Sequence, residues 1–164
     1  MRVFGFSGHS GSGKTTLLTK LIPWLGDRGL RVSTIKQANQ GFDVDKPGKD
    51  SFEHRAAGAS EVLVASAVRW ALMHEYRGEP ELTQDQLLAR MSPVDLVLVE
   101  GFRRWSHPRV EVWRAALGKD PIFPDDSLVA AVASADPVPG LDRPLLPLDD
   151  VDAIGRFVLK EVGL

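Results

Sequence analysis

Short runs of apolar residues alternate along the chain with segments in which apolar residues recur at helical spacing. The runs predict buried strands, because a strand covered on both faces shows little polar alternation. They occupy residues 3–6, 30–36, 95–100 and 128–133. Segments 15–22 and 151–162 predict amphipathic helices, the second capped by Asp149 or Asp150. Strands interleaved with helices predict an α/β fold with a largely parallel central sheet flanked by helices.

The middle of the chain predicts smaller elements. A short helix is expected over residues 51–57, capped by Ser51 and ended by the glycine that follows. Residues 62–66 and 68–74 predict two strands paired as a hairpin, although the second segment is also compatible with a helix. A capping-box pattern predicts a further helix over residues 83–91.

Three segments interrupt the main pattern. Pro23 lies inside the first helical segment, where its missing N–H group should bend the helix or end it early. Residues 109–114 alternate apolar and polar side chains, which predicts a strand with one exposed face. Residues 137–148 are rich in proline and predict an irregular connection. The chain shows no internal repeat, and we expect a single domain over residues 1–164.

The segment between the first strand and the first helix fits the phosphate-binding pattern G-x-x-x-x-G-K-[ST] without a mismatch. Gly8, Gly11 and Gly13 allow the backbone to curl so that its N–H groups point inward, at the positive end of a helix dipole. Lys14 is expected to reach the β- and γ-phosphates, and the Thr15 hydroxyl to complete a Mg²⁺ shell. The sequence therefore predicts a nucleotide-binding domain with the three-layer architecture of P-loop NTPases.

Ligands of such sheets bind beyond the carboxyl ends of the parallel strands, and this rule selects further candidates. Lys36 ends the second predicted strand and could add positive charge near the phosphates, or be an ordinary exposed lysine. Glu100 ends a buried strand, where a carboxylate can contact Mg²⁺ or orient an attacking water. Asp136 follows the last buried strand and could accept hydrogen bonds from guanine. The usual N-K-x-D pattern is absent, however, and an Asp-Pro turn is the alternative.

The loop after the second strand concentrates charge, with three carboxylates and two lysines in residues 43–50. Asp45 and Asp50 are candidate Mg²⁺ ligands, since Mg²⁺ is usually held by one or two carboxylates and phosphate oxygens. A solvated turn is the alternative. A second cluster could bind an anionic ligand or a partner, or form a plain solvated loop. It comprises Arg103, Arg104, Trp105, His107 and Arg109.

Composition narrows the class of protein. The formal net charge of −2 lacks the basic excess that would make nucleic acid the main partner. The absence of cysteine excludes disulfides and thiolate metal sites. The chain has no apolar run long enough to span a membrane, and its first strand begins too early for a signal peptide. We therefore expect a cytoplasmic protein that binds neither nucleic acid nor membranes.

Taken together, the motifs resemble those of the MobB family of molybdopterin-guanine dinucleotide biosynthesis. The resemblance rests on the phosphate loop, Ile35-Lys36, the segment from Phe42 to Ser51, the turn at 57–59 and the strand from Asp95 to Phe102. The D-x-D-K-P-G-K-D-S segment within it is far more specific than the phosphate loop. These motifs follow one another in order over residues 1–115.

The resemblance implies a dimeric GTP-binding protein with weak GTPase activity. It would assist a MobA-like guanylyltransferase, which joins GMP to molybdopterin and so forms the guanine dinucleotide version of the molybdenum cofactor. The residues implied to contact the phosphates are Gly8, His9, Ser10, Gly11, Ser12, Gly13, Lys14, Thr15 and Thr16. Thr15, Asp50 and Glu100 would surround Mg²⁺. Lys14 would stabilise charge on the γ-phosphate, while Glu100 or Asp45 positions a water.

The chain departs from the family pattern in two places. Gln37, Asn39 and Gln40 stand where the family often has histidines, so amide hydrogen bonds would replace any histidine chemistry there. Arg103 replaces a lysine after E-G-F, which keeps the charge and changes its geometry.

A second resemblance offers an alternative. Dethiobiotin synthetase and related enzymes also combine a phosphate loop, a lysine after the second strand and a V-E-G strand end. That resemblance would imply an ATP-dependent kinase or ligase that acts on a small acid.

Overall fold

The computed structural model describes residues 1–38 and 41–164, and the chain divides into two compact units. One unit, which we call the sheet unit, comprises residues 1–37 and 92–164. The other, the hairpin unit, comprises residues 38–91. The expectation of one domain over the whole chain stays a prediction. In the described part of the chain, no helix is long and apolar enough to cross a membrane.

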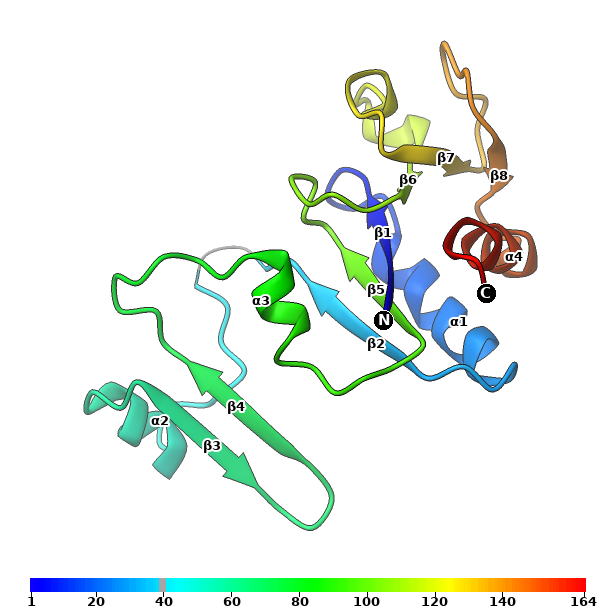
Figure 1. Cartoon of the computed structure of the whole chain (residues 1–164). Helices are drawn as coiled ribbons and strands as arrows, with labels where there is room; N and C mark the ends of the chain where they lie inside the picture. Colours follow the sequence, from blue (N-terminus) through cyan, green and yellow to red (C-terminus); the bar gives the residue numbers. More distant parts are fainter. Residues whose placement is uncertain (39–40) are drawn as a thin grey trace. The chain divides into compact units, whose positions relative to one another are not determined.

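The sheet unit contains a parallel sheet with the strand order β2-β5-β1-β6-β7-β8 among the described residues (Figure 1). Its strands are β1 (Arg2–Ser7), β2 (Val32–Lys36), β5 (Leu96–Glu100), β6 (Arg109–Val112), β7 (Val129–Ser134) and β8 (Leu145–Pro147). Phe6 and Lys36 both pair in register with Glu100. The carboxyl ends of β1, β2 and β5 therefore meet at one edge of the sheet, which confirms the largely parallel α/β fold.

Two helices pack together and bury one face of this sheet. They are α1 (Lys14–Gly26) and α4 (Val151–Val162), the second capped by Asp150 as expected. Pro23 does not end α1, which continues for another three residues to Gly26, so that part of the expectation is wrong. Leu25 is fully buried in the core just beyond the proline. Its burial offsets the backbone hydrogen bond that the proline lacks.

The expectation of a half-exposed strand at residues 109–114 is also wrong, because all four residues of β6 are buried. Glu111 is enclosed because its carboxylate accepts hydrogen bonds from the backbone N–H groups of Ile122 and Phe123, at 2.8 and 2.9 Å. Arg109 is enclosed because it donates to loop carbonyls and pairs with Asp126 at 3.7 Å. Buried charges are tolerated where such partners satisfy them.

The segment 137–148 is less irregular than its prolines predict. Its end forms β8, which adds a parallel edge strand beside β7. Pro147 occupies the last position of that edge strand, where its missing N–H group does not interrupt a central ladder. Two short 3₁₀ helices complete the sheet unit: η1 (Ala115–Leu117) and η2 (Phe123–Asp125).

The hairpin unit confirms the predicted hairpin, formed by the antiparallel strands β3 (Glu61–Ala65) and β4 (Trp70–His74). It also contains α2 (Asp50–Ala56) and α3 (Gln84–Leu88). The capping box of α3 is present, although the helix is shorter than expected. Ser51 does not cap α2, because Lys49 occupies the cap position and the Ser51 hydroxyl donates to Asp45 instead.

The two faces of the hairpin differ in exposure. Side chains alternate between faces along each strand, and Val62 on one face is buried. Leu63 pairs with Leu72 and Ala65 pairs with Trp70 on the other face. Leu63 is 60% exposed and Trp70 is 63% exposed. The hairpin unit by itself therefore leaves an apolar strip uncovered.

The contact between α1 and α4 generates a stability prediction. A Cβ added at Gly155 of α4 would lie 2.4 Å from Cζ3 of Trp24, whose indole N–H donates to Asp152 at 3.2 Å. Because the ring is held in place, we expect Gly155→Ala to lower the free energy of unfolding by about 1–3 kcal/mol. Gly26→Ala is the matched control, since no atom lies within 4 Å of its added Cβ. It should raise stability by up to about 1 kcal/mol. Urea denaturation measures both, and equal effects would contradict the prediction.

Candidate functional site

The phosphate loop connects the end of β1 to the start of α1. Gly8, Gly11 and Gly13 have φ angles of 141°, 81° and 102°, which residues with a side chain rarely adopt. A Cβ added at Gly8 would also lie 2.3 Å from the carbonyl oxygen of Val112 at the end of β6. The loop therefore needs glycine both for its curl and for its close contact with the neighbouring strand.

The first turn of α1 is left open to an anion. Gly13 is its cap residue and makes no side-chain capping bond, and the turn contains no acidic residue. The N–H groups at a helix start lack partners within the helix and carry partial positive charge. A curled glycine loop that leads into such a start can bind phosphate.

Lys14 folds back over this loop. Its Nζ donates to the carbonyl oxygens of Gly8 and His9, at 2.8 and 2.9 Å. Burial lowers the pKa of Lys14, while the nearby carboxylate of Glu100 opposes that shift. The ammonium group is thus partly shielded from water and held at the loop by two of its carbonyl oxygens.

Thr15, Lys36 and Glu100 come together at the sheet edge. The Thr15 hydroxyl donates to Glu100 Oε1 at 2.8 Å. Lys36 Nζ lies 3.2 Å from the same carboxylate oxygen and 3.3 Å from Thr15 Oγ1. The Glu100 side chain is only 13% exposed. The sheet-edge rule therefore placed these three residues correctly, and their roles toward a nucleotide stay predictions.

The segment after β2 reaches the segment after β5 through Gln37. Its Oε1 accepts a hydrogen bond from the backbone N–H of Phe102 at 2.7 Å. Gly101 has a φ of 90°, and a Cβ added there would lie 2.8 Å from Cβ of Gln37. The amide of Gln37, which stands at the first position where the family often has histidine, thus binds the backbone of the segment after β5. Asn39 and Gln40 lie outside the described residues.

Asp136 follows β7 and is half-buried. Its Oδ2 accepts a hydrogen bond from the backbone N–H of Ala115 at 3.1 Å, and its own N–H donates to Ser134 Oγ at 3.0 Å. These contacts hold the carboxylate at the carboxyl end of the sheet. Its role in guanine recognition stays a prediction.

The charged cluster after Glu100 divides into exposed Arg103 and Arg104 and buried His107 and Arg109. Arg109 is fully buried and donates to the carbonyl oxygens of Arg103, at 2.8 Å, and Trp105. Trp105 stacks on Phe102 with 3.9 Å between ring centroids. Burial, together with the charge of Arg109, lowers the pKa of His107 to about 4. Arg109 and His107 therefore stabilise this loop, and neither a solvated loop nor an anion-binding surface describes them.

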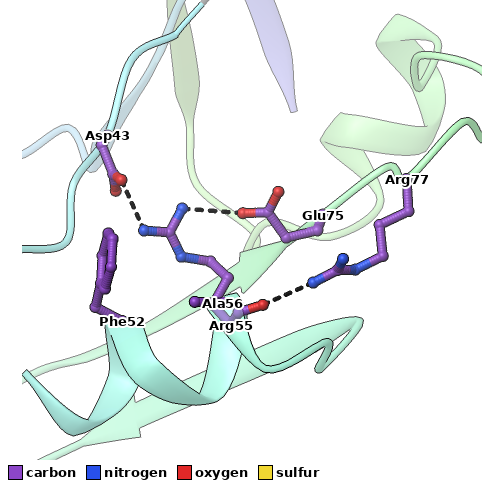
Figure 2. Close-up of a pocket in the computed structure, with 6 residues that line it drawn as sticks. All are labelled: Asp43, Phe52, Arg55, Ala56, Glu75 and Arg77. Atoms are coloured by element: carbon purple, nitrogen blue, oxygen red, sulfur yellow. Dashed lines mark hydrogen bonds and ion pairs between the residues drawn. The ribbon is translucent and has the colours of Figure 1, made fainter. Parts of the chain in front are cut away.

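A cavity of about 260 Å³ lies in the hairpin unit (Figure 2). It is lined by Asp43, Phe52, Arg55, Ala56, Glu75 and Arg77. The Arg55 guanidinium bridges Asp43 and Glu75 at 2.6 and 3.0 Å, and Arg77 donates to the Arg55 carbonyl oxygen at 2.7 Å. The hydrogen bond from Arg55 lowers the pKa of Asp43. Asp43, Arg55 and Glu75 are thus paired with one another, whereas Arg77 binds backbone carbonyl oxygens.

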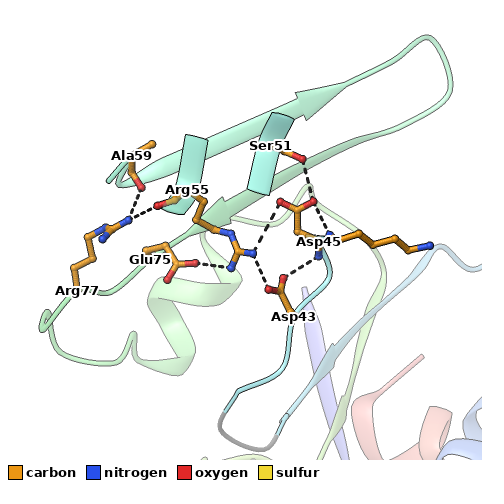
Figure 3. A network of polar contacts seen from close by, with 8 residues as sticks. Asp43, Asp45, Ser51, Arg55, Ala59, Glu75 and Arg77 are labelled. Atoms are coloured by element: carbon orange, nitrogen blue, oxygen red, sulfur yellow. Dashed lines mark hydrogen bonds and ion pairs between the residues drawn. The ribbon is translucent and has the colours of Figure 1, made fainter. Parts of the chain in front are cut away.

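Asp45 belongs to the same network, which Figure 3 shows. Its Oδ1 accepts hydrogen bonds from the Ser51 hydroxyl at 3.0 Å and from the backbone N–H of Lys46 at 2.9 Å. Its Oδ2 lies 4.0 Å from the Arg55 guanidinium, and the side chain is 8% exposed. These contacts fix the loop that leads into α2. They explain why the D-x-D-K-P-G-K-D-S segment combines acidic, turn and hydroxyl residues.

Asp50 is exposed and begins α2. Of the three expected Mg²⁺ ligands, Thr15 and Glu100 are therefore brought together in the sheet unit, whereas Asp50 lies in the hairpin unit. Within residues 1–38 and 41–164, no group of three or more His, Cys, Asp or Glu side chains could hold a metal ion. A Thr hydroxyl and one carboxylate suit Mg²⁺ that takes its other ligands from phosphate and water.

The sequence analysis missed Arg114. Its Nε donates to the carbonyl oxygen of Ser12 in the phosphate loop at 2.9 Å. The alternating pattern placed Arg114 inside a strand, although β6 ends at Val112. The sheet-edge rule would have found it, because β6 pairs directly with β1 and the residues that follow β6 lie beside the phosphate loop.

Comparisons with known proteins agree with this geometry. The family model described as "MobB: Molybdopterin guanine dinucleotide synthesis protein B" matches residues 3–135. A molybdopterin-guanine dinucleotide biosynthesis adapter protein of Escherichia coli (strain K12) is 46% identical over 161 residues, covering 96% of this chain and 91% of the relative. The adapter protein of that name from Haemophilus influenzae is 42% identical over 159 residues, covering 95% and 86%.

Solved structures support the same assignment. A crystal structure of molybdopterin-guanine biosynthesis protein B has a TM-score of 0.77 and 30% identity, with 99% of both chains covered. The MobB homologue from Bacillus stearothermophilus has a TM-score of 0.73 and 27% identity, also with 99% of both chains covered. These relatives support the first resemblance and not the ATP-dependent alternative. With a family model that spans most of its length and relatives above 40% identity along nearly all of it, this chain belongs to the MobB family.

Proposed function

We propose that this protein is a GTP- and Mg²⁺-binding adapter in the synthesis of molybdopterin guanine dinucleotide, with slow GTPase activity. One observation carries the proposal: Lys14, Thr15 and Glu100 meet at a phosphate loop in a chain of the MobB family. A cytoplasmic location is part of the proposal. So is the absence of nucleic acid and membranes among its partners.

The glycine loop and the first turn of α1 would hold the phosphates, from Gly8 through Thr16. The curled loop and the open start of α1 fit an anion. The loop keeps this curl only with glycine at position 8, because a Cβ added there would collide with its surroundings. Lys14 would exchange its loop carbonyl partners for phosphate oxygens. That exchange keeps the ammonium group hydrogen-bonded throughout.

Thr15 and Glu100 would hold Mg²⁺, with phosphate and water supplying its other ligands. When bound, Mg²⁺ supplies positive charge to the phosphates. Lys36 now neutralises Glu100 and contacts Thr15, so it would move toward the phosphates when the carboxylate takes another partner. We assign the positioning of water to Glu100 and not to Asp45, because Asp45 is committed to Ser51, Lys46 and Arg55.

Asp136 is the proposed reader of guanine. A carboxylate can accept hydrogen bonds from both N1–H and the exocyclic amine of guanine, a donor pair that adenine lacks. The hydrogen bond from Ala115 to Oδ2 would hold the carboxylate in place for this contact.

The output of nucleotide binding would be a contact with other proteins. The proposed partner is a MobA-like guanylyltransferase together with its substrate molybdopterin, in agreement with the adapter role named for the relatives. We also propose a homodimer. The uncovered apolar strip of the hairpin, with Leu63, Leu72 and Trp70, supports the proposal that this unit takes part in assembly.

Lys14→Ala should weaken the binding of a non-hydrolysable GTP analogue with Mg²⁺ by at least about a hundredfold, because a charge-assisted contact to phosphate is lost. Lys20→Ala is the matched control, since Lys20 is an exposed lysine on the same helix. Calorimetric titration measures both. Unchanged affinity in Lys14→Ala would refute the assignment of the phosphate loop.

Asp136→Ala should reduce the preference for GTP over ATP, since the carboxylate that distinguishes guanine is removed. The measurement is a pair of titrations with GTP and ATP analogues, and Asp142→Ala serves as the control because Asp142 is an exposed aspartate whose side chain pairs with Arg143. We expect a loss of selectivity of about tenfold or more. If selectivity is the same in both variants, another group reads the base.

The adapter role predicts that this protein increases the formation of molybdopterin guanine dinucleotide by a guanylyltransferase supplied with GTP and molybdopterin. Product yield with and without the protein measures the effect, and Lys14→Ala should abolish it. A protein that binds GTP but gives no stimulation would keep the nucleotide site and refute the adapter proposal.

A further inference from the structure

Arg114 contacts the phosphate loop although no phosphate-binding motif includes it. Its Nε donates to the Ser12 carbonyl oxygen at 2.9 Å, and its guanidinium lies along Gly13, where an added Cβ would be 3.3 Å from Nη2. We propose that Arg114 is a positioning residue of the nucleotide site, which orients the Ser12–Gly13 peptide so that the Gly13 N–H faces the phosphates. The proposal deepens the proposed function and rests on it.

The planarity of the peptide bond carries the argument. In a trans peptide the C=O of one residue and the N–H of the next point in opposite directions. A donor that fixes the Ser12 carbonyl from outside the loop therefore fixes the Gly13 N–H on the opposite side. Gly13 lacks a Cβ and has a φ of 102°, so its own backbone restrains this peptide weakly. A charge-assisted hydrogen bond from a guanidinium supplies the missing restraint.

Lys14 also restrains the loop, because its Nζ donates hydrogen bonds to the carbonyl oxygens of Gly8 and His9. When Lys14 turns to the phosphates, those two carbonyls lose this partner. The bond from Arg114 to Ser12 does not have to break, because Arg114 reaches the loop from the segment after β6 and contacts a different carbonyl. Arg114 would thus maintain the conformation of the Ser12–Gly13 peptide when Lys14 gives up its hydrogen bonds to Gly8 and His9.

The backbone on both sides of Arg114 is fixed. Trp113 is buried, and its indole N–H donates to the Lys119 carbonyl oxygen at 2.8 Å. The Ala115 N–H donates to Asp136 at 3.1 Å. The backbone of this segment therefore loses little conformational freedom when Arg114 binds the loop, and the cost is confined to the rotamers of the arginine side chain. The same segment connects the phosphate loop with the proposed guanine reader.

The variant Arg114→Met removes the donor and the charge while keeping an unbranched side chain. Arg143→Met is the matched control, because Arg143 is also a mostly buried arginine of the sheet unit and donates to a backbone carbonyl, that of Val129 at 2.6 Å. Arg114→Met should weaken binding of GDP and of a GTP analogue by about tenfold and leave guanosine binding unchanged. Arg114→Lys, which keeps a charged donor, should recover part of the loss.

A second readout needs no nucleotide. Hydrogen exchange of the amides in residues 8–14 should be faster in nucleotide-free Arg114→Met than in the wild type, and unchanged in Arg143→Met. If the wild type binds neither GDP nor GTP, the proposed function fails while the exchange rates still decide the positioning role. Arg114→Gln takes the place of Arg114→Met if that variant does not fold.

Three outcomes would overturn the inference. The first is unchanged loop exchange in the Arg114 variant. The second is GDP affinity equal to that of the wild type, provided that the wild type binds GDP. The third is an equal loss in the Arg114 and Arg143 variants, which would mean a general effect on stability.

Discussion

The parallel pairing of β5 between β2 and β1 is the constraint on which the candidate site depends. Because Phe6 and Lys36 share their register with Glu100, three strands end at the same edge and the phosphate loop must begin there. Backbone pairing thus places Lys36 beside Glu100, and the phosphate loop that follows β1 brings Thr15 to the same carboxylate. The chemistry of the edge can differ between related proteins while the fold that positions it stays the same.

The sequence was sufficient for the parts of this structure that are locally determined. Apolar runs predicted β1, β5 and β7, and the spacing of the glycines predicted the phosphate loop. The sheet-edge rule then placed Lys36 and Glu100 next to Thr15, because it needs only the order of strands and helices. The capping box of α3 was equally readable, since its partners lie three residues apart.

The errors concern residues whose polar partners lie outside their own helix or strand. Nothing near Arg109 or Glu111 shows that loop carbonyls and the N–H groups of Ile122 and Phe123 will satisfy them, so β6 was expected to be half-exposed. Arg114 was missed for a related reason, since its partner Ser12 lies 102 positions away. Ser51 was expected to cap α2, but its hydroxyl donates a hydrogen bond to Asp45 instead. Local propensity does not encode polar contacts with partners outside the helix or strand.

The strand order also affects how this chain acquires its shape during synthesis. β5 separates β1 from β2 in the sheet, yet the ribosome makes it after both of them and after the whole hairpin unit. The first 37 residues therefore cannot pair into their final sheet while they emerge, and closing that long loop slows the assembly. Val112, whose carbonyl oxygen packs against Gly8, arrives later still. The nascent chain therefore contains the complete phosphate-binding motif well before the strands that hold this motif in its folded conformation have been synthesised.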